Sequence, residues 1–309
     1  MTSMAERAPR LKWLIGIGLV NLATFTWATN MTLGRWLRDD IGPFTLAAAR
    51  FLIASACFVA LLHRRPQEER SLGRDRWLLL GMALSGVVIF APSLYLGLRF
   101  TTAVNATLIN GLAPLITGLM AALLIREPMS RREVMGAIVG LCGVASLISG
   151  SFLTSSTGTT GRSLGDLIVL GSVVLWGLYS VLGRQVMHHR TALSATAFSV
   201  LLGLPVLLLA AIWEMQTFPT DVRLQVLLAV VYIGIAPTLI GFLAWNTGVR
   251  RLGPSGAMMF YNTLPLYGAL LGVFFLGESI GVTHFVGGVL IVAGGLWAAL
   301  GRSEGHPRK

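Results

Sequence analysis

The chain has 309 residues, of which 54% are hydrophobic and 12% charged, and its mean hydropathy is +0.74. A water-soluble domain cannot cover its surface with so few polar side chains, so this composition excludes a soluble globular protein and predicts an integral membrane protein. The formal net charge of +11 does not indicate nucleic-acid binding, because the basic residues are scattered in short clusters between apolar runs.

Ten apolar segments are long enough to cross a bilayer as helices. A helix needs roughly 20 apolar residues to span about 30 Å of hydrocarbon, because its backbone polar groups must be satisfied within the segment. The first segment is longer than the apolar region of a signal peptide, so we expect it to be retained. In chain order the predicted helices are 12–35, 42–63, 76–98, 102–125, 132–150, 164–187, 192–214, 223–249, 255–276 and 280–301.

The distribution of positive charge predicts the orientation of these helices. With the N-terminus inside the cell, the inner loops hold 18 of the 24 Lys and Arg residues, and the outer loops hold 5. Cytoplasmic loops of membrane proteins are enriched in Lys and Arg. We therefore expect a multi-pass protein of the inner (plasma) membrane with both termini in the cytoplasm.

The chain carries an internal repeat. A polar Ser, Thr and Gly linker, 151–163, separates a first half, 12–150, from a second half, 164–301. Near the start of each half the matching residues are 149 positions apart, and further along they are 151 apart, as for Glu127 and Glu278.

Each half holds five predicted helices, an odd number, so the second half must enter the membrane from the opposite side. The predicted fold class is therefore an all-α integral membrane protein with ten transmembrane helices in two inverted five-helix repeats. Secondary transporters use such repeats to alternate access to a site near the bilayer midplane.

Three stretches resemble a known family. LAAARFLIA (46–54) and the paired runs APLITGLMAALLIREP (113–128) and LPLYGALLGVFFLGES (264–279) look like EamA-type members of the drug/metabolite transporter superfamily, and most like the YddG-type exporters of aromatic amino acids. The resemblance covers nearly all of 12–301. It implies a ten-helix basket around a central cavity, lined mainly by predicted helices 1, 3, 4, 6, 8 and 9, and export of amino acids or related metabolites.

Aromatic and amide side chains inside the predicted helices are the best candidates for substrate binding. Aromatic rings offer stacking and apolar area to a ring-bearing ligand, and Asn or Tyr can bond an amino or carboxylate group. For each residue the alternative is a structural role, such as a hydrogen bond between helices. The candidate site residues are Trp27, Asn30, Tyr95, Asn110, Trp176, Tyr179, Trp245, Asn246, Tyr261 and Asn262.

Arg50 is the only charged residue that lies away from the ends of a predicted helix, and its role stays open. It could be the counter-ion of a substrate carboxylate, or a guanidinium that satisfies neighbouring carbonyls and holds the second helix. We favour the structural role, because the resembling motif lies on a peripheral helix. Since no acidic residue lies in the middle of a helix to bind a coupling ion, we expect facilitated diffusion.

Pro114 and Pro265 occupy matched positions in the fourth and ninth predicted helices. Proline removes a backbone hydrogen bond and loosens a helix, so we predict that these residues are hinges, with a static kink as the alternative. Glycines spaced by seven residues in the fifth and tenth helices predict close helix packing, within one protomer or between two.

Other classes of protein lack the residues that they need here. The sequence has no HExxH, GxGD or GxSxG motif, so we expect no enzyme activity, no metal and no cofactor. We predict a secondary transporter that exports amino acids, aromatic ones foremost, by alternating access. A proton-coupled exporter of other metabolites or drugs and a channel-like pore are the alternatives. The expected partners are the substrate and the lipid bilayer, without nucleic acid; whether the chain is a monomer or a homo-oligomer is open.

Overall fold

The computed structural model describes residues 4–153, 160–218 and 220–304, and within these ranges every regular element is helical. The first part of the chain forms α1 (Met4–Trp36), α2 (Pro43–His63), the 3-10 turns η1 (Gln67–Arg70) and η2 (Gly73–Asp75), α3 (Arg76–Met82), the π-helical segment η3 (Ala83–Ile89), α4 (Phe90–Phe100), α5 (Ala103–Asn110), α6 (Ala113–Ile125) and α7 (Arg131–Leu153).

The second part forms α8 (Thr160–Val186), α9 (Ala192–Glu214), α10 (Leu224–Ile235), the π-helical segment η4 (Ala236–Ile240), α11 (Gly241–Tyr261), α12 (Thr263–Leu276) and α13 (Val282–Glu304). Of the predicted linker 151–163, residues 154–159 lie outside the described residues, and the remainder belongs to the ends of α7 and α8.

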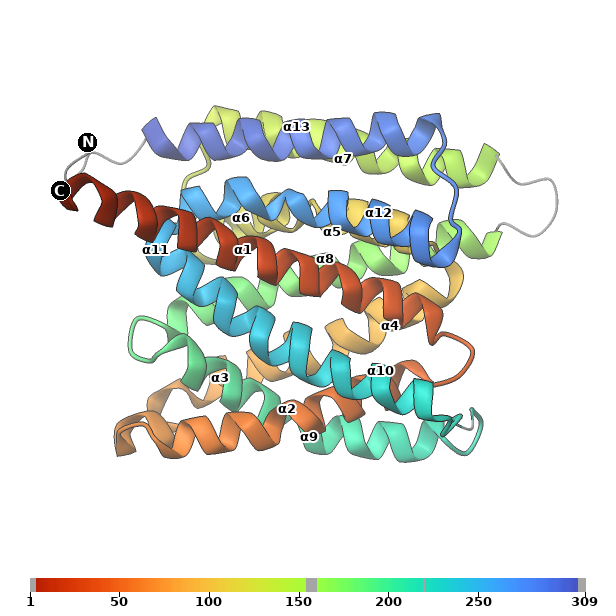
Figure 1. The fold of residues 1–309 in the computed structure, drawn as a ribbon, viewed down its shortest axis with the longest axis horizontal. Coiled ribbons are helices and arrows are strands. Elements are labelled where there is room, and N and C mark those ends of the chain that lie inside the picture. Colours follow the sequence, from red (N-terminus) through yellow and green to blue (C-terminus); the bar gives the residue numbers. More distant parts are fainter. Residues whose placement is uncertain (1–3, 154–159, 219, 305–309) are drawn as a thin grey trace.

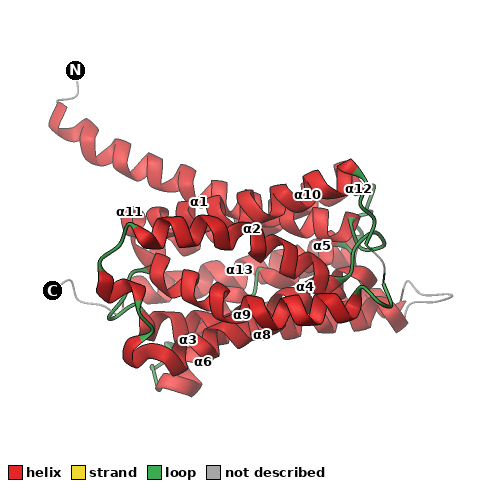
Figure 2. Cartoon of the chain, turned by 90° about the horizontal axis from the view of Figure 1, so that it is seen from below, coloured by secondary structure: helices red, strands yellow, loops and turns green. Residues whose placement is uncertain are grey.

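The axes of the helices are roughly aligned, and the helices form one bundle (Figure 1). α7 and α13 lie side by side at one edge of the bundle, α2 and α9 lie at the opposite edge, and α1 packs against α11. Most loops gather at the two ends of the helices (Figure 2). The described chain contains seven helices that are long and apolar enough to span a membrane, or eight if the bent pair α5 and α6 counts as one span.

The outer surface of the bundle is apolar. Phe274 and Phe275 of α12 are 78% and 76% exposed, and Trp213 of α9 is 70% exposed. Large rings in such numbers on a surface indicate an apolar solvent around the molecule. The predicted class, an all-helical membrane protein, therefore agrees with the structure.

Local sequence explains where several helices begin. The hydroxyl of Thr102 accepts a hydrogen bond from the backbone N–H of Asn105, which caps α5. At the start of α7, Glu133 accepts from the N–H of Ser130 while the Ser130 hydroxyl accepts from the N–H of Glu133, a reciprocal capping box. Pro43 opens α2 at a position where no intrahelical N–H is needed.

The structure breaks one predicted helix and has a second break at a predicted helix boundary. The predicted helix 102–125 breaks after Asn110, and the axes of α5 and α6 differ by 42°. The predicted boundary between 223–249 and 255–276 falls at Gly253, whose φ of 76° and ψ of 163° are not helical. Glycine has no Cβ and adopts a positive φ without steric cost, so it ends one helical run and lets a new one start.

Glycines bring the backbones of α7 and α13 into contact. A Cβ atom on Gly136 would lie 2.4 Å from the carbonyl oxygen of Gly294, and one on Gly143 would lie 2.6 Å from the carbonyl oxygen of Gly287. Any larger residue at these positions would push the two helices apart, because the opposing atom belongs to the backbone. This glycine packing lies within a single chain.

Candidate substrate cavity

A cavity lies in the middle of the bundle, between α1, α2, α4, α8, α9 and α11. Its empty volume is about 790 Å³, including the part that is open to solvent. The wall is mainly apolar and aromatic, and its polar or charged members are Asn30, Arg50, Asn110, Tyr179, Thr196, Ser199, Thr238 and Tyr261.

Aromatic rings from different helices meet in this wall. The ring centroid of Trp27 lies 6.4 Å from that of Trp176 and 6.2 Å from that of Tyr261. Trp176 also stacks on Tyr179 at 5.2 Å, with 27° between their planes, and lies 5.2 Å from Phe90. Aromatic pairs whose ring centroids lie 4.5–7 Å apart stabilise each other. These rings therefore form a connected apolar surface against which a planar ligand could pack.

Hydrogen bonds hold two of these rings in place. The indole Nε1–H of Trp27 donates to the backbone carbonyl of Pro237 at 3.1 Å. The hydroxyl of Tyr261 donates to Oδ1 of Asn110 at 3.0 Å, which ties the end of α5 to the end of α11. A Trp or Tyr that is anchored through its polar atom keeps its apolar face free for a ligand.

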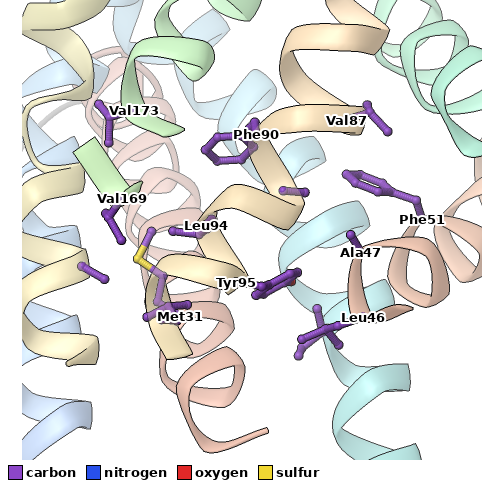
Figure 3. Close-up of a cluster of buried hydrophobic side chains, with 14 of the residues drawn as sticks. Met31, Leu46, Ala47, Phe51, Val87, Phe90, Leu94, Tyr95, Val169 and Val173 are labelled. Atoms are coloured by element: carbon purple, nitrogen blue, oxygen red, sulfur yellow. The ribbon is translucent and has the colours of Figure 1, made fainter. Parts of the chain in front are cut away.

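Arg50 of α2 belongs to the cavity wall and is 9% exposed. Its Nη1 donates to the hydroxyl of Tyr95 at 2.8 Å, and that hydroxyl donates to Oδ1 of Asn30 at 2.7 Å. Tyr95 itself is 2% exposed and lies behind the wall, where it projects from α4 toward Leu46 and Ala47 of α2 (Figure 3). The guanidinium therefore bonds to a side chain of α4, which links α2 to α4.

Six of the candidate site residues line this cavity, namely Trp27, Asn30, Asn110, Trp176, Tyr179 and Tyr261. Tyr95 and Trp245 lie directly behind them, and the ring of Trp245 is 5.4 Å from that of Trp27 and 5.6 Å from that of Tyr261.

The two remaining candidates do not line the cavity. Asn246 donates through Nδ2 to the carbonyl of Phe242, at 2.9 Å, on its own helix. Asn262 lies at the junction of α11 and α12 and lines a separate groove on α5, α12 and α13.

Sequence reasoning missed the contribution of α2 and α9 to the wall. Besides Arg50, α2 supplies Phe51 and Phe58, and α9 supplies Thr196 and Ser199. The resemblance implies that the helices at these two places are peripheral. Two signals could have found them: the unpaired charge of Arg50 inside an apolar segment, and two hydroxyl residues of α9 at the i, i+3 spacing that shares one helical face.

Two π-helical segments, η3 and η4, also form part of the wall, through Gly86, Val87, Pro237 and Thr238. The hydroxyl of Thr238 donates to the carbonyl of Ile233, five residues earlier, at 2.8 Å. Such segments are rare in proteins and concentrate at functional sites, because they widen the helix and redirect its side chains.

Pro114 and Pro265, the candidate hinges, lie next to breaks in their helices. Pro114 is the second residue of α6, just beyond the 42° bend, and Pro265 is the third residue of α12, just beyond Asn262. Among the described residues, no group of three or more His, Cys, Asp or Glu side chains could hold a metal ion.

A buried carboxylate lies at the junction of α12, α5 and α1. Glu278, whose side chain is 8% exposed, accepts hydrogen bonds from the backbone N–H groups of Ala103 and Val104 at 2.8 and 2.9 Å. Its Oε1 also lies 4.0 Å from Nε of Arg35, at the end of α1. A negative charge at a helix N-terminus is favourable, so Glu278 stabilises the contact between α12 and α5.

The matching carboxylate at the other end is more exposed. Glu127 follows α6 and forms an ion pair with Arg184 at the end of α8, and the two side chains are 48% and 43% exposed. Both α6 and α12 end in the left-handed region, at Arg126 with a φ of 55° and at Gly277 with a φ of 65°. The two carboxylates therefore follow equivalent turns in different surroundings.

The sequence is similar to proteins described as transporters. The chain is 29% identical over 288 residues to the "Uncharacterized transporter YyaM" of Bacillus subtilis (strain 168), covering 92% of this chain and 93% of that protein. It is 25% identical over 278 residues to the "Probable terminal-alkyne amino-acid exporter" of Streptantibioticus cattleyicolor, covering 88% and 89% of the two chains.

One solved crystal structure with 25% sequence identity superimposes with a TM-score of 0.61, over 97% of this chain and 99% of that one. The family model of the EamA-like transporters matches residues 14–149 and, separately, residues 163–300. These two matches cover most of the sequence, and the names of the relatives indicate transporters rather than enzymes. The chain belongs to the EamA-like transporter family.

Proposed function

We propose that this protein is a secondary transporter of the inner (plasma) membrane that exports amino acids, aromatic ones foremost, or related small metabolites by alternating access and facilitated diffusion. The observation that carries the proposal is the central cavity, whose aromatic wall is interrupted by a few amide, hydroxyl and guanidinium groups. Such a wall suits a ligand with a ring at one end and charged groups at the other. The relative described as a probable amino-acid exporter supports the same class of substrate.

The proposal includes ten membrane spans with both termini in the cytoplasm. Besides the seven long helices and the bent pair α5 and α6, two shorter apolar helices, Thr263–Leu276 and Val282–Ala298, are present. Together they correspond to the ten predicted helices. Interruptions by Gly253 and by the bend after Asn110 fit the broken helices that transporters place beside their sites.

Contacts between α7 and α13 support two inverted repeats, 12–150 and 164–301, joined by the linker 151–163. Gly136 meets Gly294, and Gly287 meets Gly143. With the offset of 151 residues, Gly136 corresponds to Gly287 and Gly143 to Gly294, so exchanging the two halves maps one contact onto the other. A pseudo-two-fold axis between these helices accounts for that exchange.

Alternating access is supported by the unequal ends of the bundle. Glu278 is buried against α5 while its counterpart Glu127 is half exposed, although both belong to the same repeated motif. A rocking motion that exchanges these two arrangements would close one end of the cavity as it opens the other. We propose that Pro114 and Pro265 are the hinges of this motion, because they adjoin the breaks between rigid helices.

The test is uptake of radiolabelled phenylalanine, leucine and lysine into proteoliposomes, with and without an imposed pH gradient. We expect saturable phenylalanine flux that does not respond to the gradient. Flux driven by the gradient would favour the proton-coupled alternative, and flux that rises linearly without saturation would favour a channel-like pore.

A pair of tryptophan variants ties this flux to the cavity. Trp176→Ala removes a ring from the cavity wall, and we expect it to abolish or strongly weaken phenylalanine flux. Trp213→Ala makes the same change on the outer surface of α9, where the ring is 70% exposed, and we expect flux close to that of the wild type. Equal flux in both variants would contradict the assignment of the cavity as the substrate site.

A further inference from the structure

We propose that the guanidinium of Arg50 is the site that binds the carboxylate of the substrate, so that the cavity accepts organic acids and amino acids but not the corresponding amines. This assignment rests on the proposed function, since it specifies how the same cavity recognises its cargo.

Arg50 has no counter-charge among the described residues. The residue is 9% exposed, and among the described residues it has no carboxylate partner and no hydrogen bond at Nε. Charges buried in a membrane protein are paired, or they belong to a functional site. A buried arginine that lacks a permanent anion is therefore available for a transient one.

The guanidinium of Arg50 is held in a fixed orientation by its neighbours. Its Nη1 donates to the hydroxyl of Tyr95, which in turn donates to Asn30, and its Cζ lies 4.5 Å from the ring centroid of Phe51. Within the described chain, Nη1 is the only guanidinium nitrogen of Arg50 with a hydrogen bond. Nε is buried without a partner, and the edge that it forms with Nη2 matches the two oxygens of a carboxylate.

The rest of the cavity wall carries no charge. Among the lining residues, Arg50 is the only one that is charged at neutral pH, and the wall contains no Asp or Glu. The remaining polar lining consists of amides and hydroxyls, which can accept bonds from an ammonium group but do not neutralise Arg50. The field inside the cavity therefore favours a ligand with a negative group, placed within reach of the aromatic rings around Trp27 and Trp176.

The test is a competition experiment on the purified protein in nanodiscs, with radiolabelled phenylalanine as the probe. The competitors are 3-phenylpropionate, which has the carboxylate and no ammonium group, and phenylethylamine, which has the ammonium group and no carboxylate. We expect 3-phenylpropionate to compete at least about 30-fold better than phenylethylamine, as for loss of one buried charge pair. Equal competition by the two compounds in the wild-type protein would overturn the assignment without any variant.

Substitutions of Arg50 then test the residue itself. Arg50→Gln should remove the preference for the carboxylate, and Arg50→Lys, which keeps the charge but not the two-pronged edge, should retain part of it. Arg38→Gln is the matched control, because this arginine is half exposed at the end of α1 and pairs with Asp39. The unfolding midpoint of each variant separates lost binding from lost fold.

The outcomes separate this inference from the proposed function. If phenylalanine does not bind and labelled 3-phenylpropionate does, in an Arg50-dependent manner, the carboxylate site stands and the amino-acid assignment fails. If phenylalanine binds wild-type protein and Arg50→Gln equally well, the proposed transport function stands and the role of Arg50 is disproved.

Discussion

At the scale of single residues, side chains behind the cavity wall hold the side chains of the wall in position. Tyr95 illustrates this, because its hydroxyl accepts from Arg50 and donates to Asn30 while its ring is buried between α4 and α2. Such a residue positions the site without touching a ligand. Changing it should therefore alter the affinity for phenylalanine more than the stability of the fold.

Tyr95→Phe tests this relay. The variant keeps the ring and removes the hydroxyl, which frees Nη1 of Arg50 and leaves Oδ1 of Asn30 without its donor. We expect phenylalanine binding to weaken by about 1–3 kcal/mol, the range for a buried polar group that loses its partner. Binding and the unfolding midpoint are compared with those of Tyr232→Phe, which loses an exposed hydroxyl contact to Thr29. Identical affinities in the two variants would contradict a relay.

The residue pattern predicts part of the site and not the rest, for physical reasons. Trp176 and Tyr179 could be predicted together, because residues three apart share a helical face. Asn246 is equally polar and lies in an equally apolar segment, yet it bonds to its own helix, since polarity alone does not reveal the direction of a side chain. The sequence allows Arg50 to be a counter-ion for the substrate, but the expectation that its helix is peripheral favours the structural role, although the residue lines the cavity.

At the scale of helices, the sequence predicts most spans but not their interruptions. Apolar length places the helices well, as for 192–214 and α9 (Ala192–Glu214). The bend after Asn110 and the π-helical segments have no simple periodic signal, because they depend on how neighbouring helices satisfy the freed backbone groups. These interrupted elements are also the ones that border the cavity.

Glycine packing between α7 and α13 gives a prediction at this scale. Gly143→Ala places a Cβ about 2.6 Å from the carbonyl oxygen of Gly287, a contact that only a backbone shift can relieve. We expect a loss of about 1–3 kcal/mol in the free energy of unfolding, as for other overpacked sites. Gly171→Ala is the control, because nothing lies within 4 Å of its added Cβ, and alanine favours the helix there. The unfolding midpoints of both variants check this, and a normal midpoint for Gly143→Ala would argue against the close contact.

At the scale of the whole molecule, the two carboxylates Glu278 and Glu127 make the proposed motion testable. Glu278 binds two backbone N–H groups at the start of α5, and in the proposed exchange Glu127 would take the equivalent role. Removing one or the other should therefore shift the conformational equilibrium in opposite directions.

The shift can be measured by labelling a cysteine in the cavity wall. Ser199→Cys, in a chain where Cys57 and Cys142 are replaced by alanine, is exposed to a membrane-impermeant thiol reagent from outside the cell. We expect Glu278→Gln to raise the labelling rate several-fold, because the conformation in which Glu278 binds α5 would lose about 1–3 kcal/mol of stabilisation. Glu127→Gln should lower the rate. A change in the same direction for both variants would rule out the exchange of ends.

Counterflow in proteoliposomes tests the central claim most directly. Vesicles loaded with unlabelled phenylalanine are diluted into buffer with a trace of labelled phenylalanine, and the label inside is followed with time. A carrier with alternating access accumulates label transiently above equilibrium, because each return step is faster with substrate bound, and this is the result that we predict. Label that only approaches equilibrium, at a rate independent of the internal substrate, would contradict a carrier and indicate a pore.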